Sequence, residues 1–241
     1  MRWKNLAKEM IGRAYHQRLI AGVRTILDSD LADLRDPGFV ADVIRGIGLR
    51  GDRRGLYGAD NSHANRFGPG LWQIPGQLAA ALVSLSSQSV RTALEVGTCD
   101  GWTSSVMAAY LQRFHPKLRF VTVDIAGRFA LHARVDQLVP IEYHATGTAE
   151  DFRGEQFDLV FIDGNHSYEW VKRDYDLVGR SSSLCMFHDI DDQNVGAENV
   201  PRFWKELKAA ESHGAEFQEF LGPEGVMGIG IRKKLAGLMS E

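Results

Sequence analysis

The sequence has few cysteines, no long apolar segment and little net charge. Among 241 residues there are two cysteines, Cys99 and Cys185, which provide neither a disulfide framework nor a zinc-ligand pattern and so favour a reducing compartment. No apolar run approaches the roughly 20 residues of a membrane span, and the charged start lacks the apolar core of a signal peptide. A net charge of −3 gives no general attraction to nucleic acid. We therefore expect a cytoplasmic protein that binds neither membrane nor nucleic acid.

A glycine-containing turn after a short apolar run is the most informative segment. The run Thr92–Val96 predicts a strand, and the pattern from Trp102 to Leu111 predicts a helix. Between them, Gly97 and Gly101 let the backbone take positive φ and let a ligand approach closely. The spacing Glu-x-Gly-x-x-x-Gly is wider than that of dinucleotide sites, which suits a cofactor without a pyrophosphate. We expect Glu95 to face the cationic amino end of such a cofactor, and Thr98 and Cys99 to line the turn.

Two further segments carry residues suited to a nucleoside. The run from Arg119 closes on Asp124 and Ile125, and an acidic residue at the end of the second strand of such a fold usually accepts hydrogen bonds from ribose hydroxyls. A cap on the next turn is the alternative role for Asp124. A short third strand is expected at 141–145, and the polar turn after it offers groups that can contact an adenine edge. The residues of that turn are Thr146, Gly147 and Thr148.

Polar clusters follow two more apolar runs. Residues 157–162 are almost continuously apolar, as expected of a parallel strand buried on both faces, and lead into Asp163 and His166. Residues 183–187 lead into His188 and Asp189 in the same way. Because ligands bind at the carboxyl ends of strands in open α/β sheets, both clusters should open onto the same crevice as the glycine turn. A histidine titrates near neutral pH, so His166 and His188 are candidate general bases.

Taken together, these motifs resemble the class I S-adenosylmethionine-dependent methyltransferases. The segment 95–101 is similar to their first motif, and Asp124 matches the acidic residue of the second. One branch has a Phe-Ile-Asp-Gly-(Asp/Asn)-His-(Ser/Thr)-Tyr segment, a strand that ends in His-Asp, and a Gly-Val-x-x-Phe-Trp helix. This chain has the first at 161–168, then His188-Asp189 and Val200-Pro201-Arg202-Phe203-Trp204. It departs from the branch at Asn199, where glycine is frequent, and at 179–183, where a Pro-Gly-Gly turn is frequent.

The resemblance implies a cofactor, an acceptor and, in some members, a metal. Carboxylates at the ends of the fourth and fifth strands hold one Mg²⁺ in metal-assisted O-methyltransferases, and the matching residues here are Asp163 and Asp189, with Asp163 also near the cofactor. His188 replaces an acidic residue of some relatives and would be a softer ligand, better suited to Mn²⁺, Fe²⁺ or Zn²⁺. Contact of Asp163 with the cofactor and a turn-capping Asp189 are the alternative. Gln73 belongs to a Gln-x-Pro segment that borders the cofactor pocket in this branch.

The remaining segments complete an α/β architecture. We expect a Rossmann-like seven-stranded sheet, mostly parallel, with a C-terminal antiparallel hairpin formed by strands at 216–220 and 225–231. A helix is expected over 200–210.

Apolar side chains from Trp3 to Leu19 recur at helical spacing beside an excess of basic residues. This predicts an amphipathic helix that packs on the core, or alternatively lies on a partner or membrane surface. Residues 46–70 predict a long loop over the site. We therefore divide the chain into a helical extension and lid (1–70), through which copies of the chain could associate, and an S-adenosylmethionine-binding domain (71–241).

The predicted function is methyl transfer from S-adenosylmethionine to a small-molecule acceptor, most simply a hydroxyl oxygen, with or without a divalent cation. The protein would align the sulfonium methyl and supply a deprotonated nucleophile. A binding module that keeps the cofactor fold without catalysis is the first alternative. A nicotinamide-dependent oxidoreductase is disfavoured by the single wide glycine loop and the terminal hairpin.

Overall fold

The protein is described by a computed structural model covering residues 2–51, 55–65, 68–191, 196, 198–222 and 225–235, with side chains of the first helix from residue 12 onward. The chain divides into two compact units. The sheet unit comprises residues 89–98, 118–127 and 142–241, and the helical unit comprises 1–88, 99–117 and 128–141. Each unit is therefore built from segments that are separated in sequence. The domain boundary at residue 70 stays a prediction.

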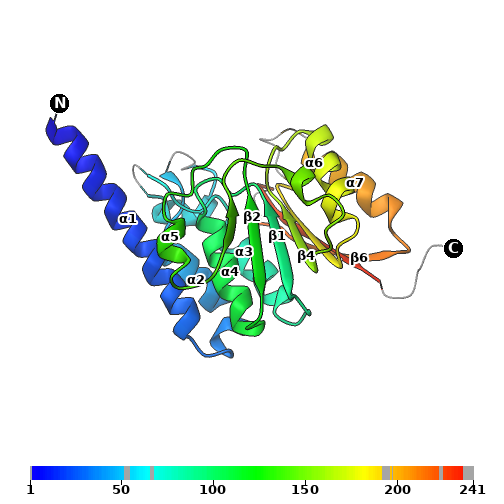
Figure 1. Cartoon of the computed structure of the whole chain (residues 1–241), viewed down its shortest axis with the longest axis horizontal. Coiled ribbons are helices and arrows are strands. Elements are labelled where there is room, and N and C mark those ends of the chain that lie inside the picture. The colour runs from blue at the N-terminus through cyan, green and yellow to red at the C-terminus, as the bar shows by residue number, and fades with distance from the viewer. Residues whose placement is uncertain are drawn as a thin grey trace. The chain divides into compact units, whose positions relative to one another are not determined.

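The sheet unit is organised around one seven-stranded sheet with strand order β3-β2-β1-β4-β5-β7-β6. The five neighbouring strands β3, β2, β1, β4 and β5 are parallel to one another, whereas β7 is antiparallel to both β5 and β6. This arrangement confirms the predicted fold class, including the C-terminal hairpin (Figure 1). The strands are β1 (Thr92–Val96), β2 (Arg119–Val123), β3 (Glu142–His144), β4 (Leu159–Ile162), β5 (Leu184–His188), β6 (Ala215–Phe220) and β7 (Ile229–Lys234).

One face of the sheet is covered by helices of the same unit. Alternate residues of β1, β2, β4 and β5 point into a core shared with α6 (Tyr168–Asp174), the π-helical turn η5 (Tyr175–Gly179) and α7 (Val200–Ala210). Phe187 lies at the centre, with ring contacts to Tyr175, Phe203 and Trp204. The predicted helix at 200–210 is confirmed, and its Phe-Trp pair packs in the core. The strand β4 is buried along its whole length, as its apolar run predicts.

The last strand begins later than predicted. We expected it over 225–231, but β7 starts at Ile229. Met227 and Gly228 have φ values of 62° and 85°, which are incompatible with an extended strand. Residues 223 and 224, in the predicted hairpin turn, lie outside the described residues.

The helical unit contains seven helical segments in the described residues. Within it α1 packs on α2 and α4, and α2 packs on α3. The helix α2 begins at Pro37 because Asp36 caps it, accepting a hydrogen bond of 2.8 Å from the Gly38 amide. None of the described helices is long and apolar enough to cross a membrane. The segments are α1 (Arg2–Asp28), η1 (Asp33–Arg35), α2 (Pro37–Ile47), η3 (Gly58–His63), α3 (Pro75–Leu85), α4 (Trp102–Phe114) and α5 (His132–Val135).

The structure corrects the prediction that residues 46–70 form a long loop without regular structure. Its first two residues belong to α2, and the 3-10 helix η3 lies within it. Leu49 forms isolated bridges with Ala64 and Leu71, and both Leu49 and Tyr57 are buried. Sequence periodicity missed this segment because its order comes from a few buried anchors and not from a repeating apolar pattern. The side chains of Trp3, Leu6, Met10 and Ile11 in the predicted amphipathic stripe lie outside the described residues.

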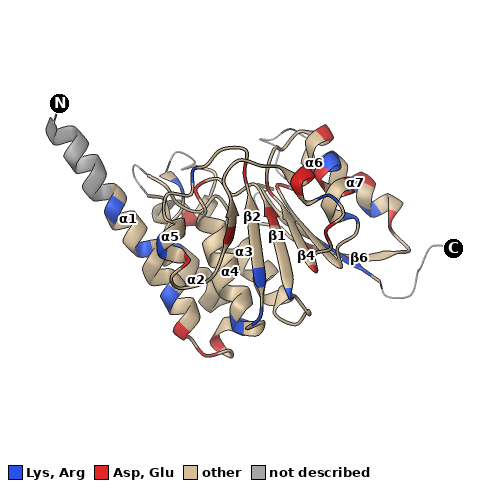
Figure 2. Cartoon of the chain, in the orientation of Figure 1, with Lys and Arg blue, Asp and Glu red and all other residues tan. Residues whose placement is uncertain are grey.

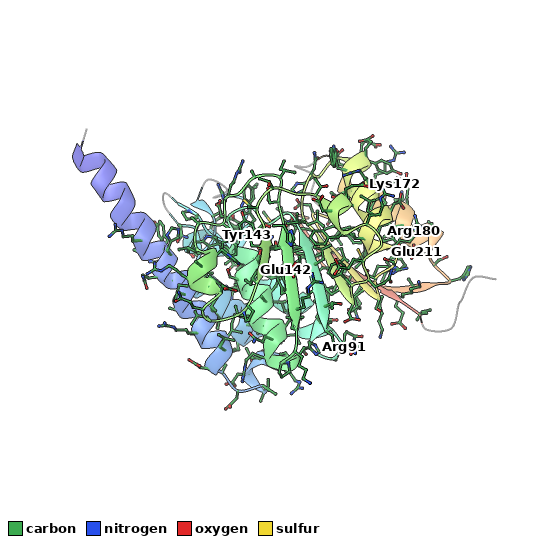
Figure 3. All side chains as sticks on the ribbon, in the orientation of Figure 1. Arg91, Glu142, Tyr143, Lys172, Arg180 and Glu211 are labelled. Atoms are coloured by element: carbon green, nitrogen blue, oxygen red, sulfur yellow. The ribbon has the colours of Figure 1, made fainter. Side chains whose placement is uncertain are left out.

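Ion pairs and a buried arginine connect the hairpin to the helices of the sheet unit. Acidic and basic residues lie together along α6 and α7 (Figure 2). Arg232 in β7 is buried, binds Glu211 at 2.8 Å and donates to the carbonyl of Ser182 at 3.0 Å. Glu211 also accepts a hydrogen bond from Tyr175 and lies beside Arg180 (Figure 3). The charge on Arg232 is thus compensated where it is buried.

A buried carboxyl in α6 makes stability depend on pH. Burial raises the pKa of Asp174 to about 6, and Arg173 offsets only part of this rise. Because the folded-state pKa exceeds the unfolded value, the unfolding free energy should fall as pH rises from about 4 to about 6 and stay lower above that range. Asp174→Asn should therefore raise the unfolding free energy at neutral pH by about 1–3 kcal/mol in urea titrations.

Asp176 provides the matched control. Burial works against the ion pairs of Asp176 with Lys172 and Arg180, but the two cations prevail and lower its pKa. Asp176→Asn should lose stability at neutral pH and show a weaker loss on acidification. An Asp174→Asn protein less stable than its parent at neutral pH would contradict the assignment.

Candidate active site

The glycine turn after β1 is held against the ends of two neighbouring strands. Gly97 has φ of 106°, and its amide donates to the Val123 carbonyl of β2 at 2.9 Å. A Cβ at this position would lie 2.7 Å from the Cα of Gly164 and would collide with the carbonyl oxygen of Asp163. Both the backbone angle and the close approach therefore require glycine. The turn therefore leaves β1 directly beside the residues that follow β4.

Glu95 lies within the sheet and not on its surface. Its side chain is fully buried, and Thr122, its partner in the β1–β2 register, donates to Glu95 Oε2 at 2.6 Å. The hydroxyl of Thr122 lies 2.7 Å from that of Thr98, which is also buried. A chain of two hydroxyl groups thus connects the carboxylate to the first part of the turn. The role of Glu95 toward a cofactor stays a prediction, and Thr122 is a residue that the sequence analysis missed.

The ends of β2 and β3 bring together the residues predicted to bind a nucleoside. Asp124 Oδ1 accepts a hydrogen bond from the Ala126 amide at 2.9 Å, and the Asp124 carbonyl accepts one from Gly147 at 2.9 Å. Ile125 is 78% exposed. Thr148 caps the 3-10 helix η4 (Ala149–Phe152). The side chain of Asp124 therefore closes a turn, and ribose binding stays a prediction.

Four titratable groups meet where β4 and β5 end. His188 Nδ1 lies 3.1 Å from Asp163 Oδ1 and 3.2 Å from Asp189 Oδ1. His166 Nδ1 lies 3.1 Å from Asp189 Oδ2, and its Nε2 lies 3.7 Å from Asp163 Oδ1. The side chain of His188 is 4% exposed, whereas that of His166 is 37% exposed. The structure therefore brings together the residues that the sequence placed on two separate strands.

Neighbouring groups shift the pKa values of Asp163, His188 and His166. Burial alone would raise the pKa of Asp163, yet His188 and His166 bring it down to about 2. Burial would lower the pKa of His188, but Asp189 and Asp163 outweigh it and raise the pKa well above its usual value. The pKa of His166 is likewise raised by Asp163 and Asp189 against the effect of burial. Both imidazoles therefore favour the protonated form beside two carboxylates.

The cluster has the donors that a divalent cation requires. Asp163, His166 and Asp189 each offer one ligand atom, and these atoms lie within 4.8 Å of one another. Carboxylate oxygens suit hard cations, and one imidazole nitrogen widens the set to Mn²⁺, Fe²⁺ or Zn²⁺. The histidine in this group is His166 and not His188, the ligand expected from the sequence. The buried Nδ1 of His188 already lies between the two carboxylates.

The other predicted cofactor residues belong to the helical unit. Gln73 is buried and accepts a hydrogen bond of 2.5 Å from Thr103 at the start of α4. Cys99 has a positive φ of 49°, and Gly101, at 77°, is the residue before α4. Their part in cofactor binding stays a prediction.

Arg50, which the sequence analysis did not single out, binds Asp100 at 2.5 Å and lies over the Trp72 ring. No motif contains Arg50, and only the fold of the helical unit places it beside the glycine turn.

Comparison with known proteins agrees with this geometry. Residues 94–190, which run from β1 through β5, match the family model described as a methyltransferase domain. Over these residues the chain is similar to that family. This match, together with the sheet topology, confirms the predicted resemblance to class I methyltransferases. No curated protein sequence is significantly similar to this chain.

Solved structures share the fold. The O-methyltransferase TomG from Streptomyces achromogenes, involved in tomaymycin synthesis and solved with S-adenosylmethionine, superposes with a TM-score of 0.52 at 22% identity over 69% of this chain and 82% of its own. An O-methyltransferase from Bacillus cereus, solved with S-adenosylhomocysteine, gives 0.50 at 21% identity over 74% and 87%. A candidate O-methyltransferase from Klebsiella pneumoniae gives 0.52 at 22% identity over 82% and 90%.

Replacing Gly97 tests the constraint on the turn. Gly97→Ala should lower the unfolding free energy by about 1–3 kcal/mol, because the added methyl group overpacks against the backbone that follows β4. Gly154→Ala is the matched control, since Gly154 also has positive φ, at 83°, but nothing lies within 4 Å of its Cβ position. Thermal or urea unfolding of both variants measures the difference. Equal losses would show that only the backbone angle matters at Gly97.

Proposed function

We propose that the methyltransferase domain binds S-adenosylmethionine and transfers its methyl group to a hydroxyl oxygen of a small molecule. The observation that carries this proposal is the Asp163–His166–His188–Asp189 cluster at the strand ends beside the glycine turn. Such a cluster combines carboxylates and imidazoles that can bind a polar acceptor and exchange its proton. The superposed structures whose names include O-methyltransferase give further support.

The cofactor would lie across the carboxyl ends of the parallel strands. Asp124 is assigned to the ribose hydroxyls, because a carboxylate accepts both of their hydrogen bonds. Ile125, exposed beside it, offers an apolar contact for the adenine ring, and the turn at 146–148 offers polar contacts at its edge. The glycine turn is assigned to the amino-acid end. Cys99, Gly101 and Gln73 are assigned to cofactor binding on the resemblance of their motifs alone.

When bound, S-adenosylmethionine supplies an activated methyl group on a sulfonium, so the protein must align the acceptor and take up its proton. His166 is the most exposed group of the cluster. We assign His166 Nε2, in the neutral form of the ring, to uptake of the proton of the acceptor hydroxyl; because the pKa of His166 is raised, its imidazolium first loses a proton to solvent. His188, buried between the two aspartates, orients their carboxylates.

A divalent cation fits the same residues and would change these roles. Asp163, His166 and Asp189 would hold it, and when bound it would lower the pKa of an acceptor hydroxyl. It would also compensate the carboxylate charges that keep the imidazoles protonated. Ligation and proton exchange are alternative roles for His166, and they differ in their dependence on metal. Cytoplasmic location and association of copies through the N-terminal extension remain part of the proposal.

Titration calorimetry tests the proposed function. S-adenosylmethionine should bind in the micromolar range in the presence of EDTA. The same titration with Mg²⁺ or Mn²⁺ in place of EDTA should reveal whether the Asp163 cluster binds a metal. Methyl transfer to a panel of phenolic and sugar hydroxyls, followed by formation of S-adenosylhomocysteine, tests catalysis. Binding without transfer to any acceptor would favour a non-catalytic module. Absence of binding under every condition, with NADH as the comparison ligand, would overturn the proposal.

Substitution of Asp124 tests the cofactor assignment. Asp124→Asn keeps an oxygen that can accept from the Ala126 amide but removes the charge and one acceptor for the ribose. Affinity for S-adenosylhomocysteine should fall about tenfold while thermal stability is unchanged. Asp136→Asn is the control, because Asp136 accepts from the Ile141 amide in a comparable turn. Unchanged affinity in the Asp124 variant would remove the ribose assignment.

A further inference from the structure

The buried hydroxyl chain at the end of β1 has a defined direction. Thr122 donates to Glu95 Oε2 at 2.6 Å, and a threonine hydroxyl has only one proton. In the 2.7 Å contact between Thr122 and Thr98, the proton must therefore come from Thr98. Both hydroxyl protons point toward the carboxylate, and both oxygen ends point toward the glycine turn. The two dipoles are aligned and strengthen one another in a buried environment.

Glu95 itself is not placed to touch a ligand. Its side chain is 0% exposed, and it lies within the sheet, opposite Thr122 in the β1–β2 register. Thr98 is buried as well, but it belongs to the turn that follows β1, and its backbone amide donates to the Val123 carbonyl at 3.3 Å. The hydroxyl chain is thus a connection from the carboxylate to the backbone of the turn.

We propose that Glu95 acts on the cofactor through Thr122 and Thr98 and not by direct contact. The aligned hydroxyl groups extend the negative potential of the buried carboxylate to the turn, which favours a ligand with a cationic amino group at that point. Thr122 and Thr98 are then positioning residues that give the turn its preference for the amino-acid end of the cofactor. This inference rests on the proposed function, since it assumes that S-adenosylmethionine is the ligand.

A purely structural role makes a different prediction. Two threonines that only satisfy a buried carboxylate would affect stability, and would affect all ligands of the site alike. The positioning role affects only ligands that carry the amino group. Probes that differ in this group therefore separate the two roles.

The experiment compares Thr122→Val with Thr122→Ser. Valine keeps the shape but removes the hydroxyl, whereas serine retains it. Calorimetry uses three probes: S-adenosylhomocysteine, decarboxylated S-adenosylmethionine, which keeps the amino group, and methylthioadenosine, which lacks the whole amino-acid part. Thr122→Val should weaken binding of the first two about tenfold, because the aligned hydroxyl groups no longer extend the potential of Glu95 to the turn, and change methylthioadenosine affinity less than about twofold. Thr122→Ser should restore the parent values.

Each other outcome has a defined meaning. Equal loss for all three probes, or no loss for any, overturns the positioning role. Loss for S-adenosylhomocysteine alone would overturn it too, because the carboxylate and not the amino group would then be the group recognised. If Thr122→Val does not fold, Thr98→Val and Thr98→Ser interrupt the same chain at its other end and are read in the same way. If the parent protein binds none of the probes, the proposed function fails, which is a separate result.

Discussion

The close approach of Gly97 to the backbone that follows β4 is the constraint on which the site depends. A side chain at 97 would collide with the carbonyl of Asp163, so only glycine lets the turn after β1 pass the end of β4. The same contact fixes where Asp163 leaves the sheet, and Asp163 in turn lies against both histidines of the cluster. The glycine is therefore a structural condition for both the turn and the acidic cluster, which the sequence presents as separate motifs.

Acidic residues lie together at the carboxyl ends of the central strands, because parallel strands end on the same side of the sheet. Glu95, Asp124, Asp163 and Asp189 lie at or just after the ends of β1, β2, β4 and β5. The protein compensates these charges in two ways, with hydroxyl groups at Glu95 and with imidazoles at Asp163 and Asp189. Acidic residues at the strand ends suit a cofactor that carries a sulfonium and an ammonium, and they also suit a divalent cation.

The sequence predicted the centre of the sheet well because β1, β2, β4 and β5 are short, mostly apolar runs bounded by turn residues, and β1 and α7 match the predicted end points. It also predicted that Asp163 and Asp189 would meet. It could not predict which histidine, His166 or His188, joins the two aspartates as a candidate metal ligand, because that depends on which imidazole the aspartates enclose. Thr122 was missed because its role arises from register with Glu95. The local order within residues 46–70 could not be predicted, because their buried anchors have no periodicity.

A crystal structure with S-adenosylhomocysteine and Mn²⁺ tests the central claim most directly. The account predicts ribose hydroxyls at Asp124, the homocysteine amino group at the glycine turn, and no direct contact between the ligand and Glu95. Anomalous scattering from manganese between Asp163 and Asp189 would assign the metal. A ligand bound away from the carboxyl ends of β1 and β2, or a saturated crystal with no ligand density there, would contradict the account.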